Sequence, residues 1–359
     1  MSDVESIAEN WTREWRHLLR RTLARNLQHY GIIWALVVVV LLVHMGNSHF
    51  LTSDNVLNIG SQWSYRGIVV VGMVFVLVVG GFDLSVGATF GTSALVAAIV
   101  SDAYGGGAGL VAALAVGAAI GAANGVLVTK LHVNAFVATL GMAFLIRGAA
   151  GALSNNNTYT VDSSLFRWLG DGRLGVIPVS LILFLILAIL LGLVLWRSAW
   201  GLQIYATGGN SEAARLAGIR VDAIRMSAFV LVGMCAALGG VLLLGQTSNV
   251  QAASFGMNLE IEVIAAALIG GVSIAGGEGA VWRGVAGVTL LAVLQNYFNL
   301  SGSGAWQDAI KGAVLILAVA MDSWTRNRRT PMRRRDRVKE EKLDTPHPRD
   351  ARKPDFSED

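Results

Sequence analysis

The chain has 359 residues, of which 54% are hydrophobic and 14% are charged. Soluble domains carry about 25% charged residues, so this composition excludes an ordinary water-soluble enzyme. About ten helices of roughly 20 apolar residues each would cross a bilayer and leave short connections between them. That arrangement leaves no room for a separate catalytic domain.

The formal net charge is +4, and the basic residues are concentrated near the two ends of the chain. Residues 1–30 form a basic arm that we expect in the cytoplasm. Residues 31–322 form the expected transmembrane domain, and residues 323–359 form a basic tail. The composition of the tail predicts a disordered cytoplasmic segment near anionic lipid or an acidic partner surface. This distribution of charge does not favour nucleic acid as a partner.

Ten apolar segments predict an all-α membrane protein, a polytopic bundle of about ten transmembrane helices. The segments lie at Tyr30–Gly46, Arg66–Gly80, Leu84–Val100, Gly106–Val128, Ala135–Leu153, Ile177–Trp196, Met226–Gln246, Val263–Gly276, Val281–Leu300 and Asp308–Met321. Connections with basic residues, such as Lys130, Arg215 and Arg283, alternate with connections that have few. Because basic residues favour the cytoplasmic side, both termini are predicted in the cytoplasm. Cys235 lies inside an apolar run and is expected to be a packed side chain.

Residues Gly80–Gly87, with the sequence GGFDLSVG, interrupt a long apolar region with permissive glycines and one carboxylate. Irregular backbone at membrane depth survives only where protein or a water-filled cavity satisfies its polar groups. Asp83 is therefore a candidate functional residue. The alternative is that Asp83 only caps the following helix.

Residues Ile269–Gly279 repeat the same rhythm, a double glycine followed by a polar residue, which indicates a weak internal repeat. Further charges lie in or beside the segments: Glu260 and Glu262 open the eighth, and Arg147 lies inside the fifth. Arg147 needs a carboxylate, carbonyl groups or water, and it could brace the bundle or touch a substrate. Asp308 and Lys311 are spaced as a local ion pair.

Residues 197–225 form the longest connection assigned to the cytoplasm. Asn210 or Ser211 can cap a short helix there, Glu212 suits its first turn, and Gly218 can end it. A short capped helix held by the membrane domain is a suitable lever for a partner protein. The alternative is an amphipathic helix that lies on the membrane surface.

Four ordered motifs resemble the permease subunits of ATP-binding-cassette importers for sugars, the ribose, xylose and galactose type. They are Gly80–Gly87, Ala135–Gly141 followed by Arg147 and Gly148, Tyr205–Ile219, and Ile264–Gly277. The resemblance runs from about Leu51 to Met321. The chain departs from the family pattern at Asn134, where proline is usual, and at Phe82, where isoleucine is common. Asn134 could therefore expose a polar side chain to the transport path.

The resemblance implies a multi-pass protein of the bacterial cytoplasmic (inner) membrane that is not itself an enzyme. Its implied partners are a second permease subunit, an ATPase subunit and an extracytoplasmic sugar-binding protein, besides membrane lipid. The chain has no phosphate-binding Gly-x-x-x-x-Gly-Lys-Ser/Thr loop, so we expect no cofactor on this chain and ATP on the partner subunit. Glu212, Ala213, Ala214 and Gly218 are the residues expected to dock into the ATPase.

Polar residues in apolar surroundings are the candidates to line a path for a neutral polyol. They are Asp83, Ser85, Asn134, Thr139, Arg147, Gln251, Glu262 and Asn296. The alternative function is a secondary transporter driven by protons or sodium, with Asp83 or Glu262 as the titrating group. The cytoplasmic lever and the scarcity of mid-span carboxylates favour the ATP-driven importer. A membrane-embedded enzyme has little support, because no acid–base or nucleophile cluster is visible in the sequence, and no metal site is expected.

Overall fold

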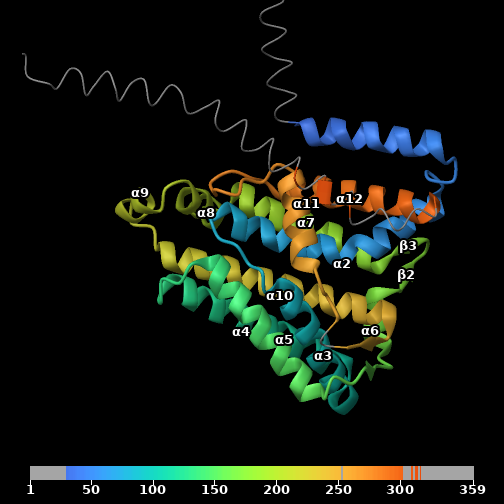
Figure 1. The fold of residues 1–359 in the computed structure, drawn as a ribbon, viewed down its shortest axis with the longest axis horizontal. Coiled ribbons are helices and arrows are strands. Elements are labelled where there is room, and N and C mark those ends of the chain that lie inside the picture. The colour runs from blue at the N-terminus through green and yellow to red at the C-terminus, as the bar shows by residue number, and fades with distance from the viewer. Residues whose placement is uncertain (1–29, 252–253, 302–308, 310–311, 314–315, 317–359) are drawn as a thin grey trace, which may run out of the picture. The chain divides into compact units, whose positions relative to one another are not determined.

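A computed structural model describes residues 30–251, 254–301, 309, 312–313 and 316 as a bundle of helices (Figure 1). The helices are Tyr30–Gly46, α2 (Ser53–Val78), α3 (Val86–Tyr104), α4 (Gly106–Thr129), α5 (Ala135–Ser154), α6 (Ser164–Gly170), α7 (Val179–Arg197), α8 (Ala199–Gly209), α9 (Ser211–Leu216), α10 (Val221–Thr247), α11 (Leu259–Ile269) and α12 (Val281–Ser301). The N-terminal arm before residue 30, the tail, and the pair Asp308 and Lys311 lie outside the described residues.

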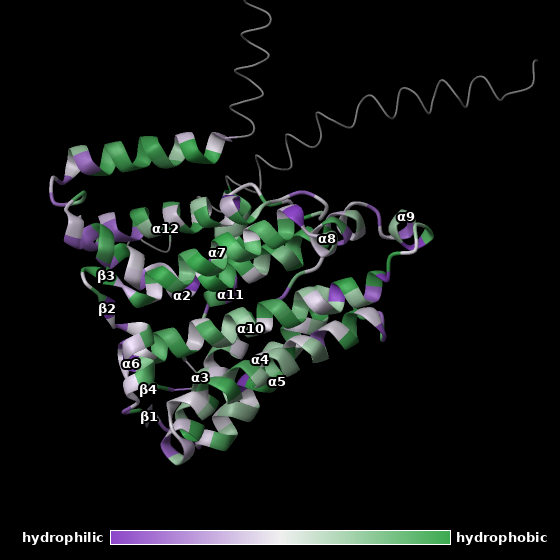
Figure 2. Cartoon of the chain, turned by 180° about the vertical axis from the view of Figure 1, so that it is seen from behind, coloured by the Kyte–Doolittle hydropathy of each residue, from purple (hydrophilic) through white to green (hydrophobic). Residues whose placement is uncertain are grey.

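Six helices of the described part are long and apolar enough to cross a membrane: α2, α3, α4, α5, α7 and α10. Hydrophobic residues make up most of their length (Figure 2). The helix Tyr30–Gly46 is apolar but shorter, and α12 has the length of a span with a less apolar sequence. The expectation of an all-α polytopic bundle is confirmed.

Helices α2 and α10 form the centre of the bundle. The run from Gly67 to Val78 in α2 is buried on every side, as expected for a helix that is apolar all round. Helix α10 packs against α2, α3, α4, α6 and α8. Glycines permit the tightest of these contacts, since a Cβ atom at Gly117 of α4 would clash with the Gly233 carbonyl oxygen of α10. Cys235 of α10 is buried, as the sequence predicted.

Short strands order the connections at the end of the bundle opposite α8 and α9 (Figure 1). Strand β1 (Tyr159–Thr160) pairs antiparallel with β4 (Asn249–Val250), and β2 (Arg173–Leu174) pairs antiparallel with β3 (Ile177–Pro178). The first pairing joins the connection after α5 to the connection after α10. The two ends of the bundle therefore differ: strands and α6 lie at one, and α8 and α9 at the other.

The eighth apolar segment differs from the expectation of a span over Val263–Gly276. Helix α11 has 11 residues, begins at Leu259 and ends at Ile269. At 1.5 Å per residue it is about 16 Å long, roughly half the thickness of the hydrocarbon core. Gly271 ends the helix because its φ of +86° is left-handed. The sequence alone could not separate a half-length helix from a span, because a short apolar run fits both.

Candidate functional site

The first interruption of the bundle lies between α2 and α3 and is held by buried polar side chains. The Asp83 Oδ1 atom accepts hydrogen bonds from the Ser85 backbone N–H at 2.8 Å and from the Ser85 hydroxyl at 2.6 Å. The Asn124 amide of α4 donates to the Ser85 Oγ atom at 2.7 Å. The Thr139 hydroxyl of α5 accepts from the Leu84 N–H at 3.0 Å. These bonds tie the interruption to both α4 and α5.

Three of the predicted path residues, Asp83, Ser85 and Thr139, thus come together in one network. Asp83 is only 1% exposed, and Ser85 and Thr139 are fully buried. Asp83 accepts from Ser85, the residue that precedes α3, and no side chain in the described part of the chain caps the first turn of α3, so these bonds form a local turn and not the helix cap of the alternative. Sequence reasoning missed Asn124. The signal was available, because Asn124 is the only amide side chain in the apolar run 106–129.

The second interruption, residues 270–280, meets the first one. The Gly277 N–H donates to the Val78 carbonyl oxygen at 2.8 Å, at the end of α2. Within the turn, the Ser273 N–H donates to the Glu278 carbonyl oxygen at 3.0 Å. Gly276 and Gly277 have φ values of +82° and +74°, which glycine adopts without strain. The two stretches that share the double-glycine pattern are therefore neighbours in space.

The last residues of α8 also lie where the two interruptions meet. A Cβ atom at Gly208 would clash with the Val78 carbonyl oxygen and would lie 2.7 Å from the Gly277 nitrogen. A Cβ atom at Gly276 would lie 2.8 Å from the Gly80 Cα atom. We call Gly80, Gly208, Gly276 and Gly277 the glycine junction. Backbone from three separate segments meets there at distances that side chains do not allow.

Tyr205 adds a side-chain bond between α8 and the second interruption. Its hydroxyl donates to the Gly279 carbonyl oxygen at 2.7 Å. Burial raises the pKa of the Tyr205 phenol above its usual value, while the charge of Arg283 acts in the opposite direction. The hydroxyl is therefore protonated, and able to donate, at neutral pH.

The cytoplasmic connection predicted as a lever is formed by α8 and α9. The Asn210 side chain caps α9 by accepting from the Ala213 N–H at 3.0 Å, and Gly218 follows the helix with a φ of +84°. Both features were predicted from the sequence. Arg215 and Lys130 both approach Asp222 of α10, at 3.3 and 3.6 Å, and fix the return of the chain into the bundle.

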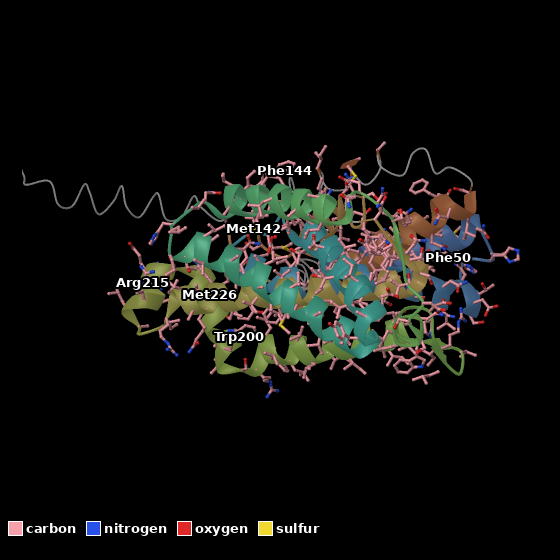
Figure 3. All side chains as sticks on the ribbon, turned by 90° about the horizontal axis from the view of Figure 1, so that it is seen from below. Phe50, Met142, Phe144, Trp200, Arg215 and Met226 are labelled. Atoms are coloured by element: carbon pink, nitrogen blue, oxygen red, sulfur yellow. The ribbon has the colours of Figure 1, made fainter. Side chains whose placement is uncertain are left out.

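The exposed surface of α9 is narrower than the sequence suggested. Glu212, Ala213 and Gly218 are exposed, and Leu216 is 91% exposed. Ala214 is only 4% exposed and packs inward, so it cannot be part of an outward contact surface. Figure 3 shows Arg215 at the end of the molecule opposite Phe50. Helix α9 thus presents a short polar and apolar surface at one end of the bundle.

The remaining predicted path residues do not join the Asp83 network. Asn134 caps α5 by accepting from the Phe136 N–H at 3.0 Å. Gln251 donates to the Asn156 carbonyl oxygen at 3.3 Å. Asn296 exchanges hydrogen bonds with Asn55 near the start of α2, whereas Asp83 follows the end of α2.

Glu262 forms an ion pair with Arg66 at 2.8 Å, between α11 and α2. The Arg66 guanidinium also lies 4.7 Å from the centre of the Trp63 ring and 4.6 Å from that of Tyr65. A charge inside an apolar bundle requires such compensation. Glu262 is therefore held by a bracing contact. Arg147 lies on α5 and has no hydrogen bond or ion pair within the part of the chain that the structure describes.

Comparison with known proteins places the chain in a family. The sequence model of the family described as "Branched-chain amino acid transport system / permease component" matches residues 55–319. The ribose import permease protein of Escherichia coli strain K12 is 38% identical over 295 residues, which cover 80% of this chain and 92% of that relative. The L-arabinose transport system permease protein of the same strain is 33% identical over 305 residues, covering 84% of this chain and 93% of the relative.

A third relative, the L-arabinose ABC transporter permease protein of Azospirillum brasilense, is 30% identical over 305 residues, covering 84% of this chain and 90% of the relative. No solved structure matches the chain. The family match spans most of the chain and includes both interruptions and the lever. This chain therefore belongs to the family of transport-system permease components, and its predicted resemblance to sugar import permeases is confirmed.

Proposed function

We propose that this chain is the transmembrane permease subunit of an ATP-binding-cassette importer that moves a monosaccharide or related polyol into the cytoplasm. The observation that carries the proposal is its 33–38% identity, over most of its length, to permeases named for ribose and L-arabinose import. The family description names branched-chain amino acids. The named sugar permeases cover the same part of the chain, and they favour a sugar as the cargo.

The proposed assembly contains two permease subunits in the bacterial cytoplasmic membrane, two ATPase subunits beneath them and a sugar-binding protein outside. The second permease subunit is either another copy of this chain or a similar chain. Because the chain has no phosphate-binding loop, ATP is bound and hydrolysed by the partner subunit, and this chain needs no cofactor of its own. Lipid covers the apolar outer faces of helices such as α7, whose Ile189 and Leu193 are exposed.

Coupling to ATP hydrolysis runs through α9 in this proposal. Glu212, Ala213 and Gly218 are exposed there and contact the ATPase, while the buried Ala214 seats the helix on the bundle. Helix α9 follows α8 directly, and α8 ends in the glycine junction. A push on α9 is therefore delivered to the backbone of both interruptions through Gly208.

Different roles follow for the candidate path residues. We assign Asp83, Ser85 and Thr139 to maintaining the shape of the first interruption. All three are buried. The Ser85 hydroxyl donates to Asp83, and the Thr139 hydroxyl accepts from the Leu84 N–H. Arg147 and the exposed Gln251 remain the candidates to meet the cargo.

A gentle-detergent purification of the tagged chain from its native membrane tests this function. Co-purification of an ATPase subunit, with ATPase activity and a sugar-binding protein that binds to the complex, is the expected result. The contrary result is a chain that is recovered without ATPase activity and still supports uptake that a proton uncoupler abolishes. That result would identify a secondary transporter.

A further inference from the structure

The first turn of α11 has two carboxylates in different situations. Glu262 is paired with Arg66, as described above. Glu260, two residues earlier, has a buried Oε2 atom with no hydrogen-bond partner in the described part of the chain. An unsatisfied buried carboxylate oxygen is costly, and native structures contain few of them. Its presence calls for a partner in some state of the protein.

Gly87 makes the position of Glu260 possible. A Cβ atom at Gly87, in the first turn of α3, would overlap the Glu260 Oε2 atom and would lie 2.6 Å from the Gly256 carbonyl oxygen. Gly87 is the last residue of the GGFDLSVG motif. The motif therefore ends on a residue that admits the Glu260 carboxylate to the surface of α3.

Arg147 is the complementary group. It lies in the middle of α5, and within the described residues it has neither a hydrogen bond nor an ion pair. Its charge nevertheless acts on the Glu260 carboxylate. Helix α3 contacts both α5, which carries Arg147, and α11, which carries Glu260. On the same helix as Arg147, a Cβ atom at Gly141 or Gly148 would meet nothing within 4 Å.

The helix that carries Glu260 is short and separated from its neighbours in the chain. Before α11, Gly256 and Asn258 have φ values of +74° and +63°, and after it Gly271 has a φ of +86°. Left-handed residues at both ends interrupt the helical hydrogen bonding, so α11 is not continuous with its neighbours. The turn after α11 leads into the glycine junction, which α8 contacts.

We infer that Arg147 and Glu260 form an ion pair in a second conformation of the transport cycle and act as a charged gate between α5 and α11. In the conformation described here the gate is open, with Arg147 unbonded and one Glu260 oxygen unsatisfied. Displacement of α11 through the glycine junction brings the two charges together and closes the path. This inference rests on the proposed function, since a gate requires a transported cargo.

Charge reversal tests the pair in the complete importer, reconstituted with its ATPase and sugar-binding protein. Arg147→Glu and Glu260→Arg are each expected to reduce ATP-driven uptake strongly. The double variant Arg147→Glu/Glu260→Arg is expected to recover at least about tenfold over either single variant, because residues that pair are coupled. A double variant no more active than the single ones would overturn the inference.

Cross-linking gives a readout that does not depend on uptake or on tolerance of reversed charges. Arg147→Cys/Glu260→Cys is treated with a short bifunctional thiol reagent, with and without ATP trapped on the complex. Cys235 is buried and leaves a low background. The yield is expected to differ at least about fivefold between the two states, as for an equilibrium shifted by about 1 kcal/mol.

The matched control is Lys130→Cys/Asp222→Cys, at an ion pair between the end of α4 and α10 that does not involve α11. Its yield is expected to be the same in both nucleotide states. Equal yields in both states at positions 147 and 260 would overturn the gate. An unmodified complex that imports no sugar would overturn the proposed function instead, so the two failures are distinguishable.

Discussion

The two interruptions of the bundle share a double glycine, yet they are held in different ways. Residues 79–85 depend on buried side chains, with Asp83 bonded to Ser85 and Asn124 joining them from α4. Residues 270–280 depend on the close approach of backbone, with Gly277 bonded to the end of α2 and packed against Gly208 of α8.

This difference indicates that the first interruption holds the backbone in place, whereas the second is placed to transmit a movement of α8. The first interruption is tied to α4 and α5 and keeps its shape through a polar network that burial strengthens. The second lies against α8, which carries the lever α9. Changes in side-chain chemistry should therefore damage the first, and added volume should damage the second.

Adding volume at the glycine junction is expected to have the largest effect. Gly208→Val places side-chain atoms against the Val78 carbonyl oxygen and the Gly277 nitrogen, both of which are backbone and cannot rotate away. Overpacking of this kind costs about 3 kcal/mol. We expect a clear loss of thermal stability in detergent and loss of ATP-driven uptake.

The neighbouring glycine supplies the control. A Cβ atom at Gly209 would meet nothing within 4 Å, so Gly209→Ala should leave stability and uptake close to those of the unmodified protein. Equal damage from both substitutions would show that the junction is not the sensitive point.

Removing the carboxylate of the first interruption is expected to have the next largest effect. Asp83→Ala leaves the Ser85 N–H and hydroxyl without their acceptor in a buried site, which costs about 2–3 kcal/mol. Asp83→Asn keeps an acceptor oxygen and should lose much less. Thermal unfolding of the two variants checks the difference. If both lost stability equally, the hydrogen bonds would not be what holds this interruption.

Removing one hydroxyl from α8 should have a smaller effect. Tyr205→Phe deletes the hydrogen bond to the Gly279 carbonyl oxygen and keeps the ring, at a cost of about 1 kcal/mol. Thermal unfolding measures this cost. Tyr104→Phe is the matched control, because Tyr104 is 80% exposed and should tolerate the change. If the Tyr205→Phe protein were as stable as the control, this hydrogen bond would not contribute to stability.

Reversing the exposed charge on the lever should have the smallest effect on stability. Glu212→Lys places a positive charge in the first turn of α9 and costs about 0.5 kcal/mol through the helix dipole. Membrane insertion and unfolding temperature should hardly change, while ATP hydrolysis is uncoupled from uptake. Parallel assays of ATPase activity and uptake decide this, and unchanged uptake would refute the role of the lever.

Much of the fold follows from the apolar segments. The fifth segment was expected at Ala135–Leu153 and the ninth at Val281–Leu300, and α5 and α12 end within a residue of those bounds. A cap at Asn210 or Ser211 and a helix end at Gly218 were also predicted, and Asn210 is the cap that forms. Both features depend only on neighbouring residues. Local chemistry of this kind is readable in sequence.

The contacts within the site could not be predicted, because they form between residues that are distant in sequence. Nothing local to Glu260 or Glu262 says which one meets Arg66 and which one meets Gly87. The same holds for the glycine junction, where Gly80, Gly208 and Gly276 are brought together only by the packing of α2 and α8. The repeated double glycine hinted that the two stretches were related, and the structure shows that they touch.

The most direct test of the central claim is sugar uptake into proteoliposomes that contain this chain with its ATPase subunit and sugar-binding protein. Uptake should require ATP on the side of the ATPase, should depend on the binding protein, and should persist in the presence of a proton uncoupler. Uptake that proceeds without ATP and disappears with the uncoupler would contradict the account.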